Sequence, residues 1–520
     1  MLESIGLKNL RSFVKTTKIE LKPITVFVGK NSSGKSSFLR TLPLFRQSIE
    51  SNTTGPILWF GRYVDFGDFS EVVSNNAKDE PIHFNFDIKT NILRNGALRI
   101  NEQEDTAINI DLGVIAQKQK TVTHSIKIAL NGVEIEIPSK NSSNLTTKII
   151  IRYKNQKIIK EDFILTRLGQ FIPNIMLARK RDDANAIKKD FYMQQQYYHH
   201  YHDEVERLYL EEAVNVIKKY FNSRTDSHKI MGILARIPIT SRGMFHHVLS
   251  AVFREQRIFS KHLIDSKDKI LDEMYPYLIA WNINALIRTI NIDLHGSFSQ
   301  VKYIAPLRAT TERYYRFQDL QVNEIDHTGS NLAMLLNSLR PNEQKEFSSW
   351  TLENFGFSVI VKEVGAHYAV KITSLDDSTE YNISDMGFGY SQVLPIITTI
   401  WLETERRKRN DKYTLMFVIE QPELHLHPEY QAKLGVLFAK VAARAKEKGV
   451  DLKIIFETHS PNIIEALGEV IEYNETGLTK DDVSVIVFDK DHDKETNISK
   501  SFFDDSGFLI NWPVGFFSGK

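Results

Sequence analysis

The sequence predicts an α/β protein built on a phosphate-binding loop, with an antiparallel β subdomain and a helical insertion. Residues 29–36 match the motif G-x-x-x-x-G-K-[ST] in full, and they follow an apolar, β-branched run at residues 24–28. Between residues 82 and 167 apolar and polar side chains alternate, with turn signals between the runs, which is typical of antiparallel strands. Beyond residue 301 predicted strands and helices alternate to the end of the chain, which is typical of a sheet covered by helices.

The phosphate-binding loop determines the class of ligand. Glycines at 29 and 34 allow backbone N–H groups to approach phosphate oxygens, at the N-terminus of a predicted helix that Pro43 should kink or end early. Lys35 is expected to reach the β- and γ-phosphates, and the Ser36 hydroxyl to ligate Mg²⁺. ATP and Mg²⁺ are therefore the expected cofactors. The predicted binding residues of the loop are Gly29, Asn31, Ser32, Ser33, Gly34, Lys35, Ser36 and Ser37.

The composition excludes several kinds of site. The 66 Lys and Arg residues balance 65 Asp and Glu residues, so any contact with nucleic acid would need a local basic patch. The chain has no cysteine, which excludes disulfides, thiolate zinc sites and cysteine nucleophiles. No apolar run approaches the roughly 18 residues that span a bilayer, and the N-terminus lacks a signal pattern. We therefore expect a cytoplasmic protein without membrane contact.

Changes of pattern divide the chain into three predicted lobes. Residues 1–170 hold the phosphate-binding loop and the β subdomain, in which Asn131-Gly132 predicts a tight hairpin. Residues 171–297 are predicted to be a helical insertion or lid, without the sustained heptads of a long coiled-coil arm. Residues 298–520 are predicted to complete the parallel core, with buried strands at 415–419, 452–456 and 483–488.

Polar motifs directly follow two of these buried strands. The first strand leads into the sequence Glu-Gln-Pro-Glu-Leu-His-Leu-His-Pro at 420–428, and the second into Glu-Thr-His-Ser-Pro at 457–461. Open α/β sheets bind ligands at the C-terminal ends of their strands. A carboxylate at Glu420 can hold Mg²⁺ beside Ser36.

Together these motifs resemble those of the ABC-type ATPase heads of the SMC, RecF and OLD group. They are most similar to the AAA-family ATPases of bacterial antiviral defence systems, the Septu- and retron-like ATPase subunits. The segments 7–13 and 507–517 are similar to the two ends of such proteins, and the resemblance covers residues 1–80 and 300–520. It implies an ABC-ATPase-type P-loop head, two of which enclose ATP between them.

The resemblance also implies roles for individual residues. Glu420 matches the acid of the second nucleotide motif, and His459 matches the switch histidine that touches the γ-phosphate. Ser384 and Gly387 precede a predicted helix at the place of the ABC signature, although the sequence differs from Leu-Ser-Gly-Gly-Gln. In ABC dimers this segment binds the γ-phosphate held by the opposite subunit, as suits a helix N-terminus.

Gln421 stands where ABC hydrolases carry the glutamate that polarises the attacking water. An amide can orient water but cannot accept its proton. Either Glu423 or another group is the base, or hydrolysis is slow and ATP acts mainly to hold two heads together. We favour slow turnover.

Other polar clusters have two readings each. His199, His200 and His202, with Asp203 and Glu206, could bind a metal, but a polar helix face is the simpler explanation. Basic clusters at 179–181, 188–189 and 406–409 could contact nucleic acid, but a solvated surface explains them as well. Asp489 and Asp491 mimic part of a Toprim nuclease motif, yet too little chain follows for such a domain.

The expected function is that of a slow ATPase that senses or gates within a bacterial antiviral defence complex and controls a separate effector, a nuclease or toxin. The expected assembly is a homodimer or higher oligomer through ATP-sandwiched heads, and binding of DNA or RNA stays open. The alternative is a RecF- or SMC-like repair or maintenance ATPase that clamps DNA. A metabolic kinase fits the switch histidine and the signature-like segment less well.

Overall fold

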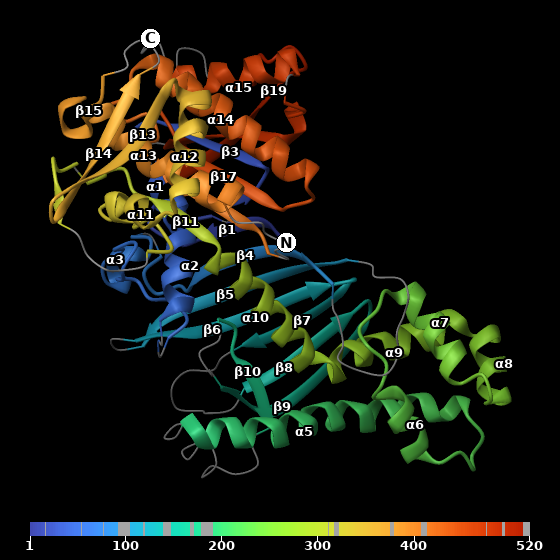
Figure 1. Ribbon diagram of the computed structural model, residues 1–520. Coiled ribbons are helices and arrows are strands. Elements are labelled where there is room, and N and C mark those ends of the chain that lie inside the picture. The colour runs from blue at the N-terminus through green and yellow to red at the C-terminus, as the bar shows by residue number, and fades with distance from the viewer. Residues whose placement is uncertain are drawn as a thin grey trace. The chain divides into compact units, whose positions relative to one another are not determined.

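The computed structural model describes most of the chain as two compact units, which we treat one at a time (Figure 1). Unit 1 comprises Met1–Leu10, Ser48–Leu58 and Gly67–Gly296, and unit 2 comprises Arg11–Gln47, Trp59–Phe66 and Ser297–Lys520. The description leaves out residues 16, 52, 54, 76, 92–104, 118–119, 139–146, 167–170, 178–190, 310, 317–321, 375–378, 407–412, 475, 491–493 and 513–520, and the side chains of 191–203.

Unit 1 is built on an antiparallel sheet in the order β10-β9-β8-β7-β6-β5-β4-β1. Buried and partly exposed residues alternate along β4, as the sequence pattern predicts for a strand with one covered face. The predicted hairpin joins β6 and β7, and both turn residues have the positive φ of a type I′ turn, 48° at Asn131 and 77° at Gly132. The strands are β1 (Leu2–Lys8), β4 (Ile82–Thr90), β5 (Thr106–Gln117), β6 (Lys120–Leu130), β7 (Val133–Pro138), β8 (Thr147–Tyr153), β9 (Gln156–Thr166) and β10 (Asn174–Leu177).

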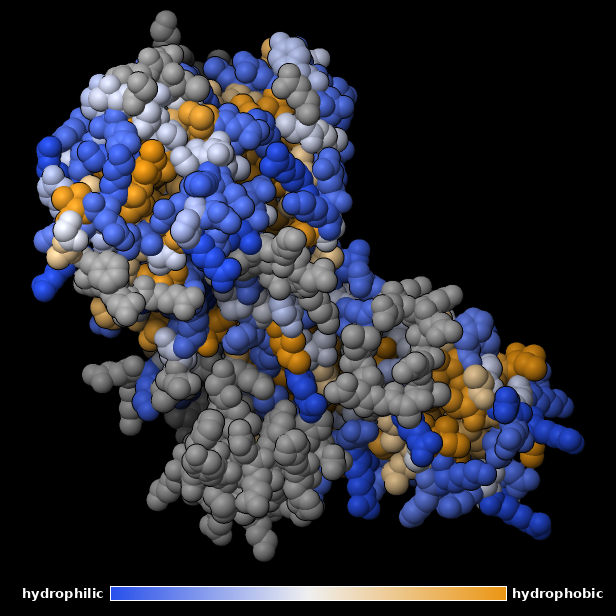
Figure 2. Space-filling view, in the orientation of Figure 1, coloured by the Kyte–Doolittle hydropathy of each residue, from blue (hydrophilic) through white to orange (hydrophobic). Residues whose placement is uncertain are grey.

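In unit 1, helices α5, α9 and α10 pack on this sheet, and α6, α7 and α8 extend beyond one end of it (Figure 1). Asn284 and Asn291 fix α10 to the sheet, because their side-chain amides bond the backbone of Ile175 and Ile172. Figure 2 shows apolar side chains among polar ones over the distal helices, where α8 exposes Ile264. The helices are α3 (Phe69–Val72), α5 (Phe191–Ile217), η1 (Lys218–Tyr220), α6 (Ser227–Leu234), α7 (Arg242–Val252), α8 (Arg257–Asp265), α9 (Lys267–Trp281) and α10 (Ile283–Ser299).

Unit 2 contains a sheet in the order β11-β16-β17-β3-β18-β19-β20, whose first five strands are parallel. Burial along β3 and β16 is complete, as expected for central strands covered on both faces. Its strands are β11 (Val301–Ile304), β16 (Leu415–Glu420), β17 (Leu452–Glu457), β3 (Ile24–Gly29), β18 (Val483–Lys490), β19 (Thr496–Phe503) and β20 (Leu509–Ile510). The predicted strands at 415–419, 452–456 and 483–488 are thereby confirmed.

A second, smaller antiparallel sheet and several helices complete unit 2. The small sheet has the order β12-β14-β13, with β15 paired to β14. Its strands are β12 (Tyr315–Arg316), β13 (Phe357–Val364), β14 (His367–Ser374) and β15 (Tyr381–Asn382); β2 (Thr17–Glu20) also lies in this unit. The helices are α1 (Lys35–Leu39), α2 (Thr41–Glu50), α11 (Leu332–Ser338), α12 (Pro341–Phe355), η2 (Ile383–Asp385), α13 (Phe388–Trp401), the π-helical turn η3 (Leu402–Arg406), α14 (Pro428–Glu447), α15 (Pro461–Tyr473) and η4 (Lys480–Asp482).

The helix after the phosphate-binding loop is interrupted, as the proline predicts, but the break lies before the proline. Helix α1 ends at Leu39 and α2 begins at Thr41, so that Pro43 falls in the first turn of α2. Pro43 has no N–H to donate to the carbonyl of Leu39, which a continuous helix would require. The interruption leaves Arg40 between the two helices.

The register of the parallel strands brings three strand ends to one edge of the sheet. Glu420 of β16 is paired with Glu457 of β17, and Glu457 is paired with Phe27 of β3, two residues before the loop begins at Gly29. Strand β17 therefore lies between β16 and β3. Within the described residues, no helix is both long and apolar enough to cross a membrane.

Candidate functional site

The loop after β3 forms a cradle that only small residues can line. Gly29 and Gly34 have φ of 151° and 108°, and Ser32 between them has φ of 62°. A Cβ atom at Gly29 would lie 2.3 Å from the carbonyl oxygen of Phe488, so the backbone conformation and the space both require glycine. Successive residues of this kind turn backbone N–H groups toward one concavity, which is the chemistry that binds phosphate.

Neighbouring segments of unit 2 support this loop through a hydrogen bond and a cluster of aromatic rings. Thr496 at the start of β19 donates its hydroxyl to the carbonyl of Ser33 at 2.8 Å. The rings of Phe13, Phe27, Phe38 and Phe488 pack against one another beneath the loop at centroid distances of 5.0 to 6.4 Å. In the described part of the chain the buried Ser33 hydroxyl has no hydrogen-bond partner. The cradle therefore fits a phosphate chain, and ATP with Mg²⁺ is consistent with it.

Lys35 lies within the loop, with its amine among backbone carbonyls. Its Nζ donates to the carbonyl oxygens of Gly29 and Lys30, each at 2.9 Å. Burial lowers the pKa of Lys35, while the negative charges of Glu457 and Glu423 act in the opposite direction. The loop thus provides a buried cation next to its N–H groups, as binding of the β- and γ-phosphates needs.

The carboxylate in contact with Ser36 is Glu457, a residue to which the sequence motifs assign no role. The Ser36 hydroxyl lies 2.9 and 2.7 Å from the two carboxylate oxygens of Glu457. Burial, and next the nearby charge of Glu420, raise the pKa of Glu457 to about 7. The signal available in the sequence was an acid at the end of a buried strand, directly before Thr458 and His459.

Glu420, the predicted partner of Ser36, is engaged elsewhere. The Arg40 guanidinium donates to both of its carboxylate oxygens, through Nε at 2.7 Å and Nη2 at 2.8 Å, and the Tyr303 hydroxyl donates at 2.5 Å. Glu420 is fully buried. The bonds with Glu420 raise the pKa of Arg40, which therefore stays charged. The structure thus brings Glu420 close to the site but not into hydrogen-bond contact with Ser36.

Gln421 occupies a tight turn immediately after β16. Its φ is 44°, its N–H donates to the carbonyl of Glu457 at 3.1 Å, and its carbonyl accepts from Arg308 at 3.3 Å. Arg308 also donates to the carbonyl of Glu420 at 2.9 Å, so it braces this strand end. The backbone at Gln421 is therefore held firmly next to the site.

Glu423 holds the segment that carries the predicted switch histidine. Its two carboxylate oxygens accept from the Thr458 hydroxyl at 2.8 Å and from the backbone N–H of His459 at 2.7 Å. Burial raises the pKa of Glu423. Burial, and then the charge of Lys35, lower the pKa of His459, so its imidazole is neutral at pH 7. Both donors stabilise the charged carboxylate, which makes Glu423 a weaker base.

The signature-like segment lies at the surface of unit 2. Ser384 is exposed, and its hydroxyl donates to Asn382 at 3.0 Å and to Asp385 at 3.3 Å. Gly387 precedes α13 with φ of 81°, and a Cβ there would meet nothing within 4 Å. Within the described residues no hydrogen bond joins Ser384 to the phosphate-binding loop. Ser384 is therefore bonded to residues close to it in the chain, and not to the phosphate-binding loop, in the part of the chain that the structure describes.

The remaining predicted residues have simpler surroundings or lie outside the description. Asn31 and Ser32 are exposed on the loop, and Ser37 accepts from Arg11 at 3.2 Å. His427 caps the N-terminus of α14. Several predicted clusters lie outside the described residues: the side chains of His199, His200, His202 and Asp203, the basic residues at 179–181, 188–189 and 407–409, and Asp491.

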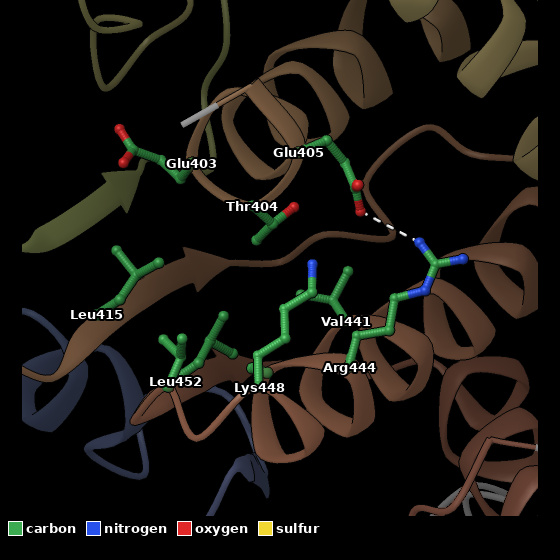
Figure 3. Close-up of a pocket in the computed structure, with 10 residues that line it drawn as sticks. Glu403, Thr404, Glu405, Leu415, Val441, Arg444, Lys448 and Leu452 are labelled. Atoms are coloured by element: carbon green, nitrogen blue, oxygen red, sulfur yellow. Dashed lines mark hydrogen bonds and ion pairs between the residues drawn. The ribbon is translucent and has the colours of Figure 1, made fainter. Parts of the chain in front are cut away.

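A separate pocket of about 410 Å³ lies at the opposite ends of the same strands (Figure 3). Leu415 and Leu452, which begin β16 and β17, line it, and an ion pair of 3.1 Å between Arg444 and Glu405 lies beside it. Because Glu420 and Glu457 end these strands, this pocket is remote from the phosphate-binding loop.

The fold and the site define a P-loop ATPase, and the chain belongs to the AAA ATPase domain family, whose model matches residues 1–464. Among curated proteins it is similar to the Septu protein PtuA of Bacillus thuringiensis, with 22% identity over 209 residues, 34% of this chain and 50% of that protein. The chain thus spans half the length of this relative. The predicted α/β class is confirmed, and so is the resemblance to AAA-family ATPases with a link to Septu.

Solved structures similar to this chain include SMC head domains. One is the SMC head domain from Thermotoga maritima, with a TM-score of 0.34, 8% identity, and coverage of 96% of this chain and 98% of that chain. Another is an Smc head domain from Pyrococcus furiosus with an extended coiled coil, bound to the C-terminal domain of ScpA. Its TM-score is 0.33, at 10% identity over 96% of each chain.

Proposed function

We propose that this ATPase is the sensor or gating subunit of a bacterial antiviral defence complex and controls a separate effector, a nuclease or toxin. ATP would be enclosed between the phosphate-binding loop of one copy and the Ser384–Gly387 segment of another. One observation carries this proposal: the signature-like segment is exposed at a helix N-terminus, and among the described residues no hydrogen bond joins Ser384 to its own loop. A second copy of the chain supplies the complementary surface.

The residues of the loop have distinct tasks in this scheme. The Lys35 amine and the backbone N–H groups after Gly29 hold the phosphates, and Ser36 holds Mg²⁺. When bound, Mg²⁺ neutralises charge that develops on the phosphates. Gln421 orients water but cannot take its proton, so turnover is slow and the closed state persists. The protein then acts as an ATP-dependent switch.

The assignment to antiviral defence rests on similarity. The motifs resemble those of defence ATPases, and the Septu protein PtuA is similar over half its length. The balanced charge of the chain gives no support to constitutive DNA clamping. We also propose an effector protein as the partner of this ATPase, and DNA or RNA as an additional ligand.

Dimer formation in the presence of ATP tests whether the nucleotide is enclosed between two copies of the chain. Light scattering of the purified protein should show ATP-dependent dimers, which Ser384→Arg abolishes because a guanidinium on a longer side chain fills the γ-phosphate position. Ser250→Arg places the same side chain on an exposed surface of unit 1 and should leave dimers intact. Dimers that persist in Ser384→Arg would show that this segment does not close the site.

A second experiment tests the gating role. The protein purified from its native host should bring down one effector protein, identified by mass spectrometry. Lys35→Ala should retain the effector but lose protection of the host against phage. Recovery of DNA-repair proteins instead, with unchanged phage resistance, would favour the DNA-clamping alternative.

A further inference from the structure

We propose that Glu457, together with Ser36, holds the divalent cation that accompanies ATP, and that Glu420 is a positioning residue kept from that cation by Arg40 and Tyr303. The inference rests on the nucleotide site of the proposed function. It reverses the role that the motif resemblance implies for Glu420.

Strand order gives the first argument. Strand β17 is paired with β3, which carries the loop, whereas β16 is one strand further away. Neighbouring strands are about 4.8 Å apart, so the end of β16 lies roughly 10 Å from β3. A carboxylate at the end of β17 is therefore the nearer one to a cation at Ser36.

The contacts of Glu457 give the second argument. Both of its oxygens lie within 2.9 Å of the Ser36 hydroxyl, the group that the motif assigns to the cation. Glu457 is 3% exposed, so its carboxylate faces the interior of the site. Mg²⁺ commonly takes one or two carboxylates plus phosphate oxygens and water. This agrees with the lack, among the described residues, of any group of three or more His, Asp or Glu side chains arranged for a metal.

The contacts of Glu420 give the third argument. A bidentate pair with Arg40 and a bond from Tyr303 use both carboxylate oxygens. Charge-assisted bidentate pairs are among the strongest hydrogen bonds in proteins, and in this one the carboxylate is fully buried. Arg40 thereby neutralises one of two adjacent carboxylates. Glu420 orients the strand end while Glu457 is left to bind the cation.

The test compares how Mg²⁺ changes the affinity for nucleotide. The affinity for a fluorescent, non-hydrolysable ATP analogue is measured in the presence of Mg²⁺ and in the presence of EDTA. All variants carry Ser384→Arg and are kept at low protein concentration, so that the measured affinity depends neither on ATP hydrolysis nor on dimer formation. Mg²⁺ should tighten binding in this background. Glu457→Gln should reduce that gain by about 10-fold or more, the usual effect of losing a metal-site partner, while Glu420→Gln retains it.

Further variants test whether the Mg²⁺-dependent gain in affinity depends on Ser36 and on the charge at position 457. Ser36→Ala should lose the gain as Glu457→Gln does, and Glu457→Asp, which keeps the charge, should recover part of it. Loss of the gain in Glu420→Gln, or its retention in Glu457→Gln, overturns the inference. If Glu457→Gln does not fold, the comparison of Glu457→Asp with Glu420→Asp decides, because only the former should weaken the gain. Absence of nucleotide binding in the parent protein would instead refute the proposed function.

Discussion

Glu420 and Glu457 are the same residue type at paired positions of adjacent strands, yet their surroundings give them different chemistry. An arginine and a tyrosine donate three hydrogen bonds to the first, whereas a serine hydroxyl contacts the second. The position of each acid after a buried strand could be predicted from the sequence. Which of them meets Ser36 could not, because this depends on the order of the strands and on the pairing of Glu420 with Arg40.

The raised pKa of Glu457 predicts a specific dependence of stability on pH. The pKa is about 7 in the folded protein and 4.5 as the ordinary value. Below pH 4.5 the group is protonated in both states, and between 4.5 and 7 only the unfolded state releases the proton, so stability falls as pH rises. Glu457→Gln should therefore be more stable than the parent at pH 8, by about 2–3 kcal/mol, and equally stable near pH 4.

Denaturant unfolding in Mg²⁺-free buffer at several pH values measures this difference. The exposed Glu465 on α15 gives a matched control, since Glu465→Gln removes a carboxylate that is in water. If Glu457→Gln raised the free energy of unfolding equally at pH 4 and pH 8, the predicted dependence of stability on the pKa of Glu457 would be wrong.

The amide at Gln421 leads to a prediction about the rate of ATP hydrolysis in the proposed switch. Gln421→Glu keeps the size of the side chain, so the backbone turn with φ of 44° should persist, and it adds a base for the attacking water. We expect phosphate release to rise by at least about 10-fold, within the range of general base catalysis, and ATP-dependent dimers to become shorter-lived. Steady-state phosphate release and dimer lifetime measure the two effects.

Gln421→Ala is the companion variant, because it removes the group that orients water and should slow hydrolysis further. Unchanged turnover in Gln421→Glu would show that another group, such as Glu423, already activates the water.

At the scale of elements, local patterns determined which segments are strands and helices, but not the order of the strands. The apolar runs at 24–28, 415–419 and 452–456 could be read directly, because buried parallel strands are continuous in hydrophobicity. The insertion of β17 between β16 and β3 depends on the pairing of β17 with β3, whose residues lie hundreds of positions apart in the sequence. That order is what makes Glu457 the neighbour of the loop.

At the junction of β3 and its loop, one added methyl group should reduce both the stability of the protein and its affinity for nucleotide. Gly29→Ala would place a Cβ 2.3 Å from the carbonyl of Phe488 in the adjacent strand β18, at a backbone φ of 151°. Either β18 or the loop must shift, so we expect a loss of stability of about 1–3 kcal/mol and at least a 10-fold loss of nucleotide affinity.

Thermal unfolding and nucleotide titration test this prediction. Gly232→Ala in α6 is the control, because a Cβ there meets nothing within 4 Å and should stabilise the helix by about 0.5–1 kcal/mol. If Gly29→Ala binds nucleotide normally, the described approach of Phe488 is wrong.

For the molecule as a whole, the proposed function divides the nucleotide site between two copies of the chain. The phosphate-binding loop and the Ser384–Gly387 segment both belong to unit 2, and the proposed closed site needs a second copy of the chain. Sequence motifs predicted both halves separately. The structure adds that Ser384 is exposed and donates to Asn382 and Asp385 close by in the chain, which the sequence could not show.

This arrangement predicts complementation between two inactive variants. Lys35→Ala removes the phosphate-binding lysine of a chain, and Ser384→Arg blocks the surface that the chain offers to its partner. In a mixed dimer, the intact loop of the Ser384→Arg chain faces the intact signature-like segment of the Lys35→Ala chain, so one of the two sites is whole. With random pairing about half of the dimers are mixed, so ATPase activity should recover to about a quarter of the parent level. Each variant alone, at the same total concentration, should stay inactive. A mixture no more active than its components would mean that the two segments do not act across a dimer.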